Sequence, residues 1–239
     1  MVKKLIILFK LGRKVACSDI LNIVSKFKEP PLAIKILFKI LSFSFSPKKQ
    51  IDANKDEGER LSDCLESMGT TFIKLGQFLA TRPDIIGEEL SKKLENLQDK
   101  LPPFSLLQAK KIIKNDLGNE SYDSIINLSE PVAAASIAQV HKAQINDNGV
   151  LKDVAIKILR PNIKKIFNEE IDAIMLFAFL IESFIKKTKR LKLVEVVFLL
   201  KEITNLEMDL RFEAAAANEY AENTKNDVGF RVPQIYWNY

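Results

Sequence analysis

Short apolar runs typical of β-strands interrupt an otherwise helical sequence between residues 126 and 160. Three runs follow one another, "IINLSEPVA", "SIAQVHKAQI" and "VLKDVAIKIL". The polar stretch Asn146–Gly149 separates the second run from the third and is a strong turn signal. Because strands joined by a tight turn pair antiparallel, this region predicts a small antiparallel sheet.

Helical periodicity flanks these runs on both sides. It predicts helices at about 58–81, at 87–100, from a cap at Ser105 to Gly118, and over most of 162–224, with stops at Arg82-Pro83-Asp84 and Leu101-Pro102-Pro103. A last β-type segment, "VPQIYWNY", ends the sequence. This order of helices, three strands, helices and one strand predicts an α+β fold, with helices on one side of the sheet.

The first 50 residues are strongly basic, with eleven Lys and Arg against two Asp and Glu. We expect two helices, 1–27 and 32–45, broken at Pro30-Pro31, and then a polar linker, 46–59. No apolar run reaches the roughly 18 residues needed to span a bilayer. Such a basic amphipathic segment either lies on an anionic membrane surface or packs on the body with a solvated basic face. The sequence leaves both readings open.

Lys157 ends the tetrapeptide V-A-I-K in the third run. Strand alternation places Ala155 and Lys157 on one face, and Val154, Ile156 and Ile158 on the other. A lysine beneath a strand-turn-strand unit can hold phosphate oxygens as a point charge. Where kinases have a glycine-rich turn, however, this chain has alanines. Alone, this lysine would be read as an exposed strand residue, but the preceding hairpin and a following acidic helix favour a phosphate site.

The acidic helix is predicted over residues 205–224 and contains Glu207, Asp209 and Glu213. On a continuous helix Asp209 and Glu213 share a face. Three carboxylates converging near one lysine would form a cation or metal–phosphate site. The alternative is a solvated helix face whose carboxylates pair with Lys and Arg.

Lys74 and Gln77 lie three residues apart on one face of the helix predicted at 58–81. Gly76 lies between them, where glycine costs about 1 kcal/mol relative to alanine. This cost suggests that another group closely approaches the backbone, although a surface Lys and Gln with an accidental glycine is the simpler alternative. The single histidine, His141, excludes a histidine-rich metal site, and no metal-binding residue is predicted.

Together these segments resemble the UbiB-type atypical kinases, a family that acts in ubiquinone biosynthesis. The family's K-x-G-Q motif matches Lys74–Gln77, and its alanine-rich loop followed by I-A-Q-V-H matches residues 133–141. Its strand lysine matches Lys157, and its E-x-D motif with a later glutamate matches Glu207, Asp209 and Glu213. The resemblance covers roughly residues 30–239, with four motifs in the family's order.

The resemblance implies a protein-kinase-like N-lobe with an N-terminal helical extension folded over the active site. We expect a basic amphipathic helical segment at 1–50, a helical extension with the K-x-G-Q motif at 51–120, and the N-lobe at 121–239. Implied catalytic residues are Lys74, Gln77, Glu207, Asp209 and Glu213. Implied ATP-binding residues are Val132, Ala133, Ala134, Ala135, Ser136, Ile137, Ala138, Gln139, Val140 and Lys157. Lys74 is expected to reach the E-x-D pair or the phosphates.

The resemblance also implies an ATP-dependent kinase or ATPase that uses ATP or ADP with Mg²⁺. In the family the catalytic loop and the Mg²⁺ ligands follow the hinge, so we expect an N-terminal part that lacks the C-lobe and is inactive by itself. The expected partners are a nucleotide, an anionic membrane surface and quinone-biosynthesis proteins. Nucleic acid is not expected, since the basic segment is interleaved with Leu and Ile rather than with stacking aromatics.

The expected location is the cytoplasm, peripheral at the inner membrane of a bacterium, rather than the mitochondrial matrix. Cys17 and Cys64 lie too far apart for a C-x-x-C pair, which favours a reducing compartment. The alternative function is that of a non-catalytic membrane- or partner-binding helical module, a degenerate remnant of the family.

Overall fold

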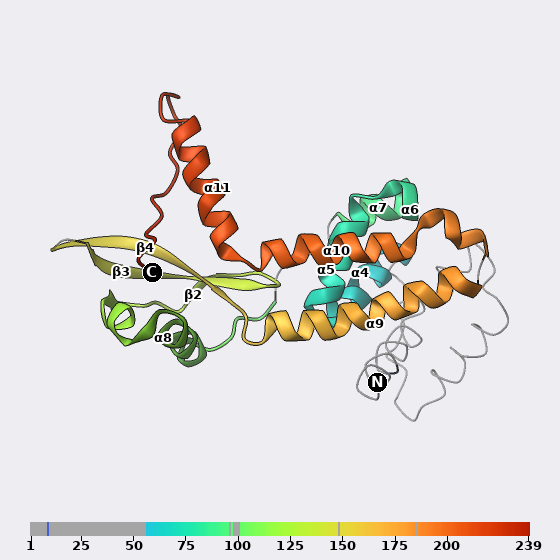
Figure 1. Ribbon diagram of the computed structural model, residues 1–239, viewed down its shortest axis with the longest axis horizontal. Helices are drawn as coiled ribbons and strands as arrows, with labels where there is room; N and C mark the ends of the chain where they lie inside the picture. Colours follow the sequence, from blue (N-terminus) through green and yellow to red (C-terminus); the bar gives the residue numbers. More distant parts are fainter. Residues whose placement is uncertain (1–8, 10–55, 96, 98–100, 148, 185) are drawn as a thin grey trace. The chain divides into compact units, whose positions relative to one another are not determined.

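The computed structural model describes residues 9, 56–95, 97, 101–147, 149–184 and 186–239. Apart from residue 9, the basic segment at 1–50, with its two predicted helices, and most of the linker lie outside these ranges. The described fold is mixed α+β with a small antiparallel sheet, as predicted (Figure 1). The chain divides into two compact units, each drawn from two stretches of sequence: 1–99 with 165–202, and 100–164 with 203–239.

The described part of the first unit is helical. Its elements are α4 (Glu57–Met68), α5 (Thr70–Ala80), α6 (Pro83–Ile86), α7 (Glu88–Leu94), most of α9 (Ile163–Phe184), the 3₁₀ helix η1 (Lys186–Leu191) and most of α10 (Leu193–Glu207). Both of its stretches bury large side chains, including Ile73 and Leu94 from the first and Phe167, Ile171 and Leu200 from the second. No described helix is both long and apolar enough to cross a membrane.

The helix predicted at 58–81 is two helices, because Gly69 adopts φ 103°, a backbone conformation that favours glycine. Its predicted start at about residue 58 is confirmed to within one residue, since α4 begins at Glu57, and the predicted linker therefore ends before residue 59. Asp56 and Glu59 form a reciprocal capping box there, with N–O distances of 2.9 and 3.0 Å. The stop at Arg82 is confirmed, and Pro83 opens the short helix α6.

The second unit contains the sheet. Its elements are α8 (Leu106–Asp123), β1 (Ile125–Ile126), β2 (Pro131–Ala134), β3 (Ala138–Asp147), β4 (Val150–Leu159) and α11 (Leu210–Asn223). The predicted Ser105 cap of α8 is confirmed, since its hydroxyl accepts from the Gln108 N–H at 3.3 Å. The first predicted strand is two short strands, because Asn127, at φ 54°, and the residues after it separate β1 from β2.

Strand β3 is central to the sheet, pairing with β4 along one edge and with β1 and β2 along the other. The predicted hairpin turn between β3 and β4 is confirmed. Gly149 adopts φ 86°, and its N–H donates to the Asn146 side-chain oxygen at 2.8 Å. The register places Val140 opposite Lys157.

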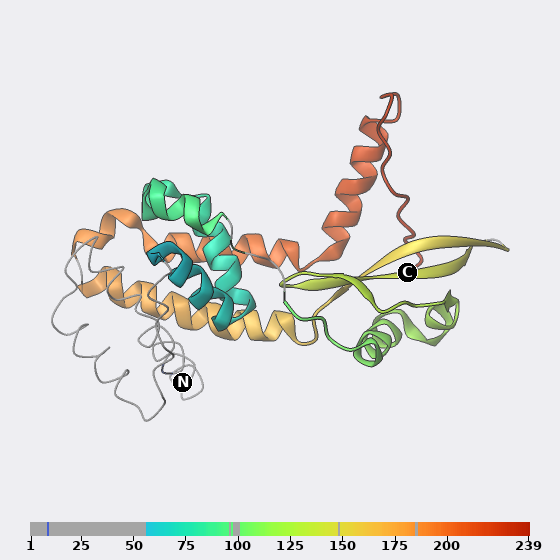
Figure 2. The same cartoon turned by 180° about the vertical axis from the view of Figure 1, so that it is seen from behind.

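Helices α8 and α11 lie on opposite sides of this sheet, so the prediction of helices on one side was wrong (Figures 1 and 2). Ala109 and Ile113 of α8 pack with Ile158 of β4, and Ile156 joins the same cluster. Lys157 lies between these two isoleucines in sequence and therefore faces the other way, as the alternation predicted.

The last segment, "VPQIYWNY", is not a strand. Pro233 lacks the N–H that a strand would donate, and Tyr239 N–H closes a turn on the Tyr236 carbonyl at 3.2 Å. Side chains fix the segment instead. The Lys152 ammonium lies 5.6 Å from the centre of the Tyr236 ring, and the hydroxyls of Tyr239 and Ser124 are 2.9 Å apart.

Candidate functional site

Lys157 and Glu213 meet across 56 residues of sequence. The Lys157 ammonium donates to both carboxylate oxygens of Glu213, at 2.8 and 2.5 Å. Lys157 comes from β4 and Glu213 from the first turn of α11, on the sheet face away from α8. Their side chains are 40% and 59% exposed, so the pair adds little to stability. The main effect of the pair is to hold the Lys157 ammonium in position.

Asp209 does not share a helix with Glu207, contrary to the prediction of one acidic helix over 205–224. Helix α10 ends at Glu207, and Asp209 is the N-cap of α11, at φ −106° and ψ 92°. Its carboxylate accepts from the Arg211 backbone N–H at 3.2 Å. Aspartate favours this position because its side chain can satisfy a free N–H of the first helical turn.

The Arg211 guanidinium also donates two hydrogen bonds to the Asp209 carboxylate, of 2.8 and 2.6 Å. This guanidinium lowers the pKa of the Asp209 carboxyl from 3.8 to about 2. Asp209 is therefore an ionised carboxylate at every physiological pH, with its charge already balanced. Across the described residues, no three His, Cys, Asp or Glu side chains are grouped closely enough to hold a metal ion.

The alanine loop, residues 132–140, does not use the backbone conformations that favour glycine. None of residues 132–140, all described by the structure, has a positive φ. The loop runs from β2 through a turn, in which the Ala135 N–H donates to the Ala138 carbonyl at 2.8 Å, into β3. The backbone of the loop therefore accepts alanine, because it lacks the positive φ that disfavours residues with a Cβ atom. Val132 and Ala133 are exposed, whereas Ser136, Ile137 and Ala138 are buried.

Two of the predicted ATP-binding residues, Gln139 and Val140, face opposite sides of the sheet. Val140 is the cross-strand partner of Lys157 and shares its face. Gln139 faces the α8 side and is 1% exposed. Its amide oxygen accepts from the Phe104 N–H at 3.0 Å, and its amide nitrogen donates to the Phe104 carbonyl at 3.2 Å. Gln139 thus joins β3 to the segment before α8.

His141, which the sequence analysis treated only as a potential metal ligand, extends this network. Its Nε2 lies 2.8 Å from the Gln139 amide nitrogen, and its Nδ1 lies 2.8 Å from the Ser129 carbonyl. Since Phe104 fixes the Gln139 nitrogen as a donor, Nε2 must accept and Nδ1 must carry the proton. No local signal in the sequence pairs residue 139 with residue 104.

Lys74 and Gln77 lie half-buried on α5, in the first unit, whereas the other candidate residues lie in the second. The predicted reach of Lys74 to the E-x-D pair or to phosphates stays a prediction. The close approach at Gly76 is confirmed, and it comes from apolar neighbours. A Cβ there would lie 2.8 Å from a Leu65 methyl and 3.0 Å from a Leu97 methyl.

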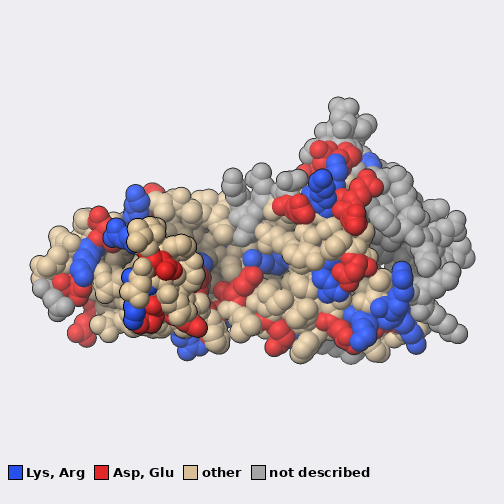
Figure 3. Space-filling model, turned by 90° about the horizontal axis from the view of Figure 1, so that it is seen from above, with Lys and Arg blue, Asp and Glu red and all other residues tan. Residues whose placement is uncertain are grey.

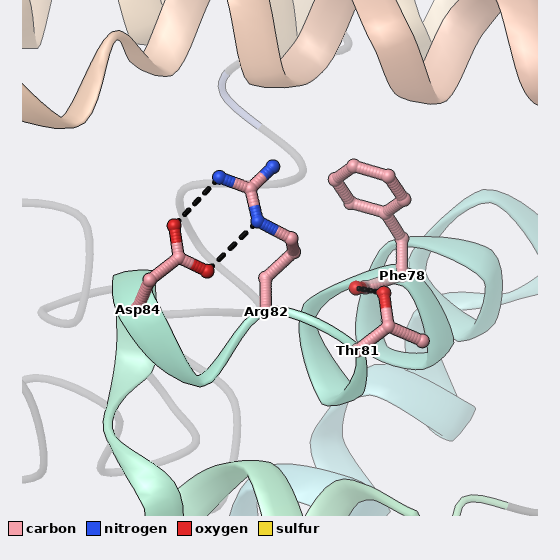
Figure 4. A network of polar contacts seen from close by, with 4 residues as sticks. All are labelled: Phe78, Thr81, Arg82 and Asp84. Carbon is pink, nitrogen blue, oxygen red and sulfur yellow. Dashed lines mark hydrogen bonds and ion pairs between the residues drawn. The ribbon is translucent and has the colours of Figure 1, made fainter.

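The end of α5 is fixed by polar contacts (Figure 4). The Thr81 hydroxyl donates to the Phe78 carbonyl at 2.8 Å, and Arg82 binds both oxygens of Asp84, at 2.8 and 2.7 Å. A cavity of about 490 Å³ adjoins Arg82, lined by Arg82, Asp84, Ile85, Arg190, Leu191, Lys192, Glu195, Val196 and Leu199. Lys192 also has a carboxylate partner, Glu195, at 2.9 Å. Two of the cavity's three cations, Arg82 and Lys192, are thus paired with carboxylates.

Comparison with known proteins shows the family of the chain. Residues 96–239 match the family described as the ABC1 atypical kinase-like domain, and the chain belongs to this family. It is 35% identical over 226 residues to a "Probable protein kinase UbiB" of Marinobacter nauticus, covering 94% of this chain and 40% of that protein. Relatives with the same name from Azotobacter vinelandii (34% identity; 89% and 39% covered) and Pseudomonas paraeruginosa (31%; 97% and 43%) also match. The chain thus spans about two fifths of the length of these relatives.

Proposed function

We propose that the second unit binds the phosphates of ATP or ADP on the sheet face that carries Lys157. The observation that supports this most is the pair formed by Lys157 and Glu213, beside the strand that leaves the alanine loop. An ammonium has three N–H donors, and Glu213 aligns two of them. The third can turn to a phosphate oxygen while Glu213 holds the side chain in place.

In this proposal the alanine loop, residues 132–140, covers the nucleotide. Its exposed part, Val132 and Ala133, offers an apolar surface, and a turn follows it before β3. Glycine would let such a turn adapt to several phosphate positions, whereas alanine restricts the backbone. We therefore expect the loop to accept a narrow range of phosphate geometries.

Mg²⁺ is expected to arrive with the nucleotide. Proteins commonly bind Mg²⁺ through one or two carboxylates together with substrate phosphates. Among the described residues no three His, Cys, Asp or Glu side chains group together, and Asp209 is bound by Arg211. No step of the proposed binding depends on the metal. Catalytic roles for Lys74, Gln77, Glu207 and Asp209 remain proposals from the family resemblance.

The proposal is tested by titrating the 239-residue chain with a fluorescent ATP analogue. Lys157→Met keeps the length of the side chain and removes its charge, so we expect affinity to fall about ten- to a hundredfold. Lys111→Met is the matched control, because Lys111 is exposed on α8, which covers the other face of the sheet. Equal affinity in the unaltered chain and Lys157→Met would reject the site.

For the whole protein we propose an ATP-dependent kinase or ATPase role in ubiquinone biosynthesis, together with other quinone-biosynthesis proteins. The support is the similarity of nearly all of this chain to bacterial relatives that are named probable protein kinase UbiB. The residues that complete the length of those relatives would have to supply the rest of the catalytic machinery.

We also propose that residues 1–50 bind an anionic membrane surface, at the cytoplasmic face of a bacterial inner membrane. The observation behind this is their excess of nine positive charges. On the described surface shown in Figure 3, basic and acidic side chains are interspersed, so no comparable basic field appears on that face. Flotation with vesicles that contain phosphatidylglycerol should retain the full chain and lose it when residues 1–45 are deleted. Equal flotation of both would reject the proposal.

A further inference from the structure

Arg160 holds the turn of the alanine loop from outside. It directly follows β4, three residues after Lys157. Its backbone N–H donates to the Ile137 carbonyl at 2.8 Å, and its guanidinium Nε donates to the Ala135 carbonyl at 2.9 Å. One residue therefore fixes two carbonyls of a turn whose own bond runs from Ala135 to Ala138.

The other edge of the same guanidinium binds a second segment of the chain. Its two terminal nitrogens donate to the carbonyls of Pro102, at 2.9 Å, and Leu101, at 3.2 Å. A planar guanidinium can direct N–H groups at three carbonyls in fixed directions, which a lysine ammonium on a flexible stem does less well. The contacts thus use a property specific to arginine.

Gln139 ties together the same two parts of the chain. Its amide makes two bonds to the Phe104 backbone, two residues beyond Pro102. The turn is therefore held from both sides by side chains that reach the segment Leu101–Phe104. Within the loop the bond from the Ala135 N–H to the Ala138 carbonyl closes the turn, and the bonds of Arg160 and Gln139 tie this turn to the segment before α8.

We propose that Arg160 is a positioning residue that pre-shapes the alanine loop for the nucleotide phosphates. This inference rests on the proposed nucleotide function. Arg160 acts through the Ala135 and Ile137 carbonyls and not by touching the ligand. It also links the loop to the strand that carries Lys157, so the two halves of the phosphate site keep a constant separation. Pre-organisation of this kind raises affinity because less conformational entropy is lost on binding.

The test uses two variants of the full 239-residue chain, with two readouts. Arg160→Gln removes the charge and most of the donors, while Arg160→Lys keeps the charge and the alkyl stem and so protects against a folding defect. We expect both to weaken binding of the fluorescent ATP analogue by about tenfold or more. Arg231→Gln is the matched control, since Arg231 is exposed and lies outside the loop and its supports.

The second readout is hydrogen exchange of single amides without nucleotide. Both Arg160 variants should speed exchange of the Ala135 amide, which closes the turn, and leave that of Ala143 in the middle of β3 unchanged. Faster exchange throughout β3 would mean a general structural role and would overturn the proposal. Unchanged Ala135 exchange, or Arg160→Lys binding as tightly as the unaltered chain, would also overturn it. If the unaltered chain binds no nucleotide, the proposed function fails, and the exchange result still decides whether Arg160 fixes the turn.

Discussion

The carboxylates of Asp209 and Glu213 stand four residues apart in sequence but bind different cations. Glu213 binds Lys157 on β4, and Asp209 binds Arg211 on its own helix. The spacing predicted a shared helical face, which requires an unbroken helix. The break arises because Asp209 caps α11, a role in which its side chain competes with a continuous helical backbone.

The Asp209 carboxyl gives a prediction about pH. Its pKa of about 2 lies below the value of 3.8 expected without its partners. A group whose pKa is lowered on folding stabilises the folded state above its unfolded pKa, and this contribution is lost as pH falls through the folded value. The loss should therefore occur between about pH 4 and pH 2.

Arg211→Gln removes the guanidinium that lowers this pKa, so the Asp209 pKa should rise toward 3.8. Carboxyl-carbon NMR titration measures it directly. Asp84 is an internal control, since its pKa is lowered by Arg82 and should not move in the variant. An Asp209 pKa that stays near 2 in Arg211→Gln would show that another group ionises it.

Residue placement could be predicted where it depended on local alternation, as for Lys157 and its isoleucine neighbours. It could not be predicted for Gln139, Arg160 and His141, whose partners outside β3 lie 12 to 59 residues away. The partners of these three side chains depend on the strand register and on the position of a coil segment. Hydrophobic periodicity in the sequence predicts neither of them. The ATP-binding role of Gln139 came from the family resemblance and stays a prediction, whereas its bonds to Phe104 had no signal in the sequence.

At the scale of helices and strands, the reliable sequence signals were those in which a residue acts on the backbone close to it. Pro83, the Ser105 cap and the turn before Gly149 each act within three or four residues, and the structure confirms each. The errors were the unbroken helices over 58–81 and 205–224 and the strand at "VPQIYWNY". Each depended on whether one residue, Gly69, Asp209 or Pro233, would interrupt an otherwise suitable pattern.

Gly76 gives a prediction about helix α5. Alanine would gain about 1 kcal/mol of helix propensity, whereas overpacking a close-packed core costs about 1–3 kcal/mol. A Cβ would meet buried methyl groups of Leu65 and Leu97 at 3.0 Å or less, so we expect the overpacking term to win. Gly76→Ala should therefore lower the free energy of unfolding by about 1 kcal/mol.

Urea denaturation measures this change, and a double-mutant cycle identifies its cause. In a Leu65→Ala background the space beside Gly76 opens, so Gly76→Ala should there become neutral or stabilising. A stabilising Gly76→Ala in the unaltered chain would contradict the close packing and leave propensity as the dominant effect.

At the scale of the whole molecule, each unit combines two separate stretches of sequence. Residues 165–202 join the first unit, and 203–239 join the sheet. Periodicity along a chain carries no information on which distant helices assemble, so this grouping could not be predicted. The proposed division at residues 50 and 120 describes functional segments and stays a prediction. The family, in contrast, could be predicted, because four short motifs kept their order over most of the chain.

The central claim is that nucleotide binds on the Lys157 face of the sheet, under the alanine loop. The most direct measurement is NMR of the chain with ¹³C-labelled alanine methyl groups, titrated with MgATP. We expect the methyls of Ala133, Ala134, Ala135 and Ala155 to shift, and that of Ala109, on the α8 side, to stay in place. Shifts confined to alanines of α9, such as Ala173 and Ala178, or no shift with excess MgATP, would contradict the account.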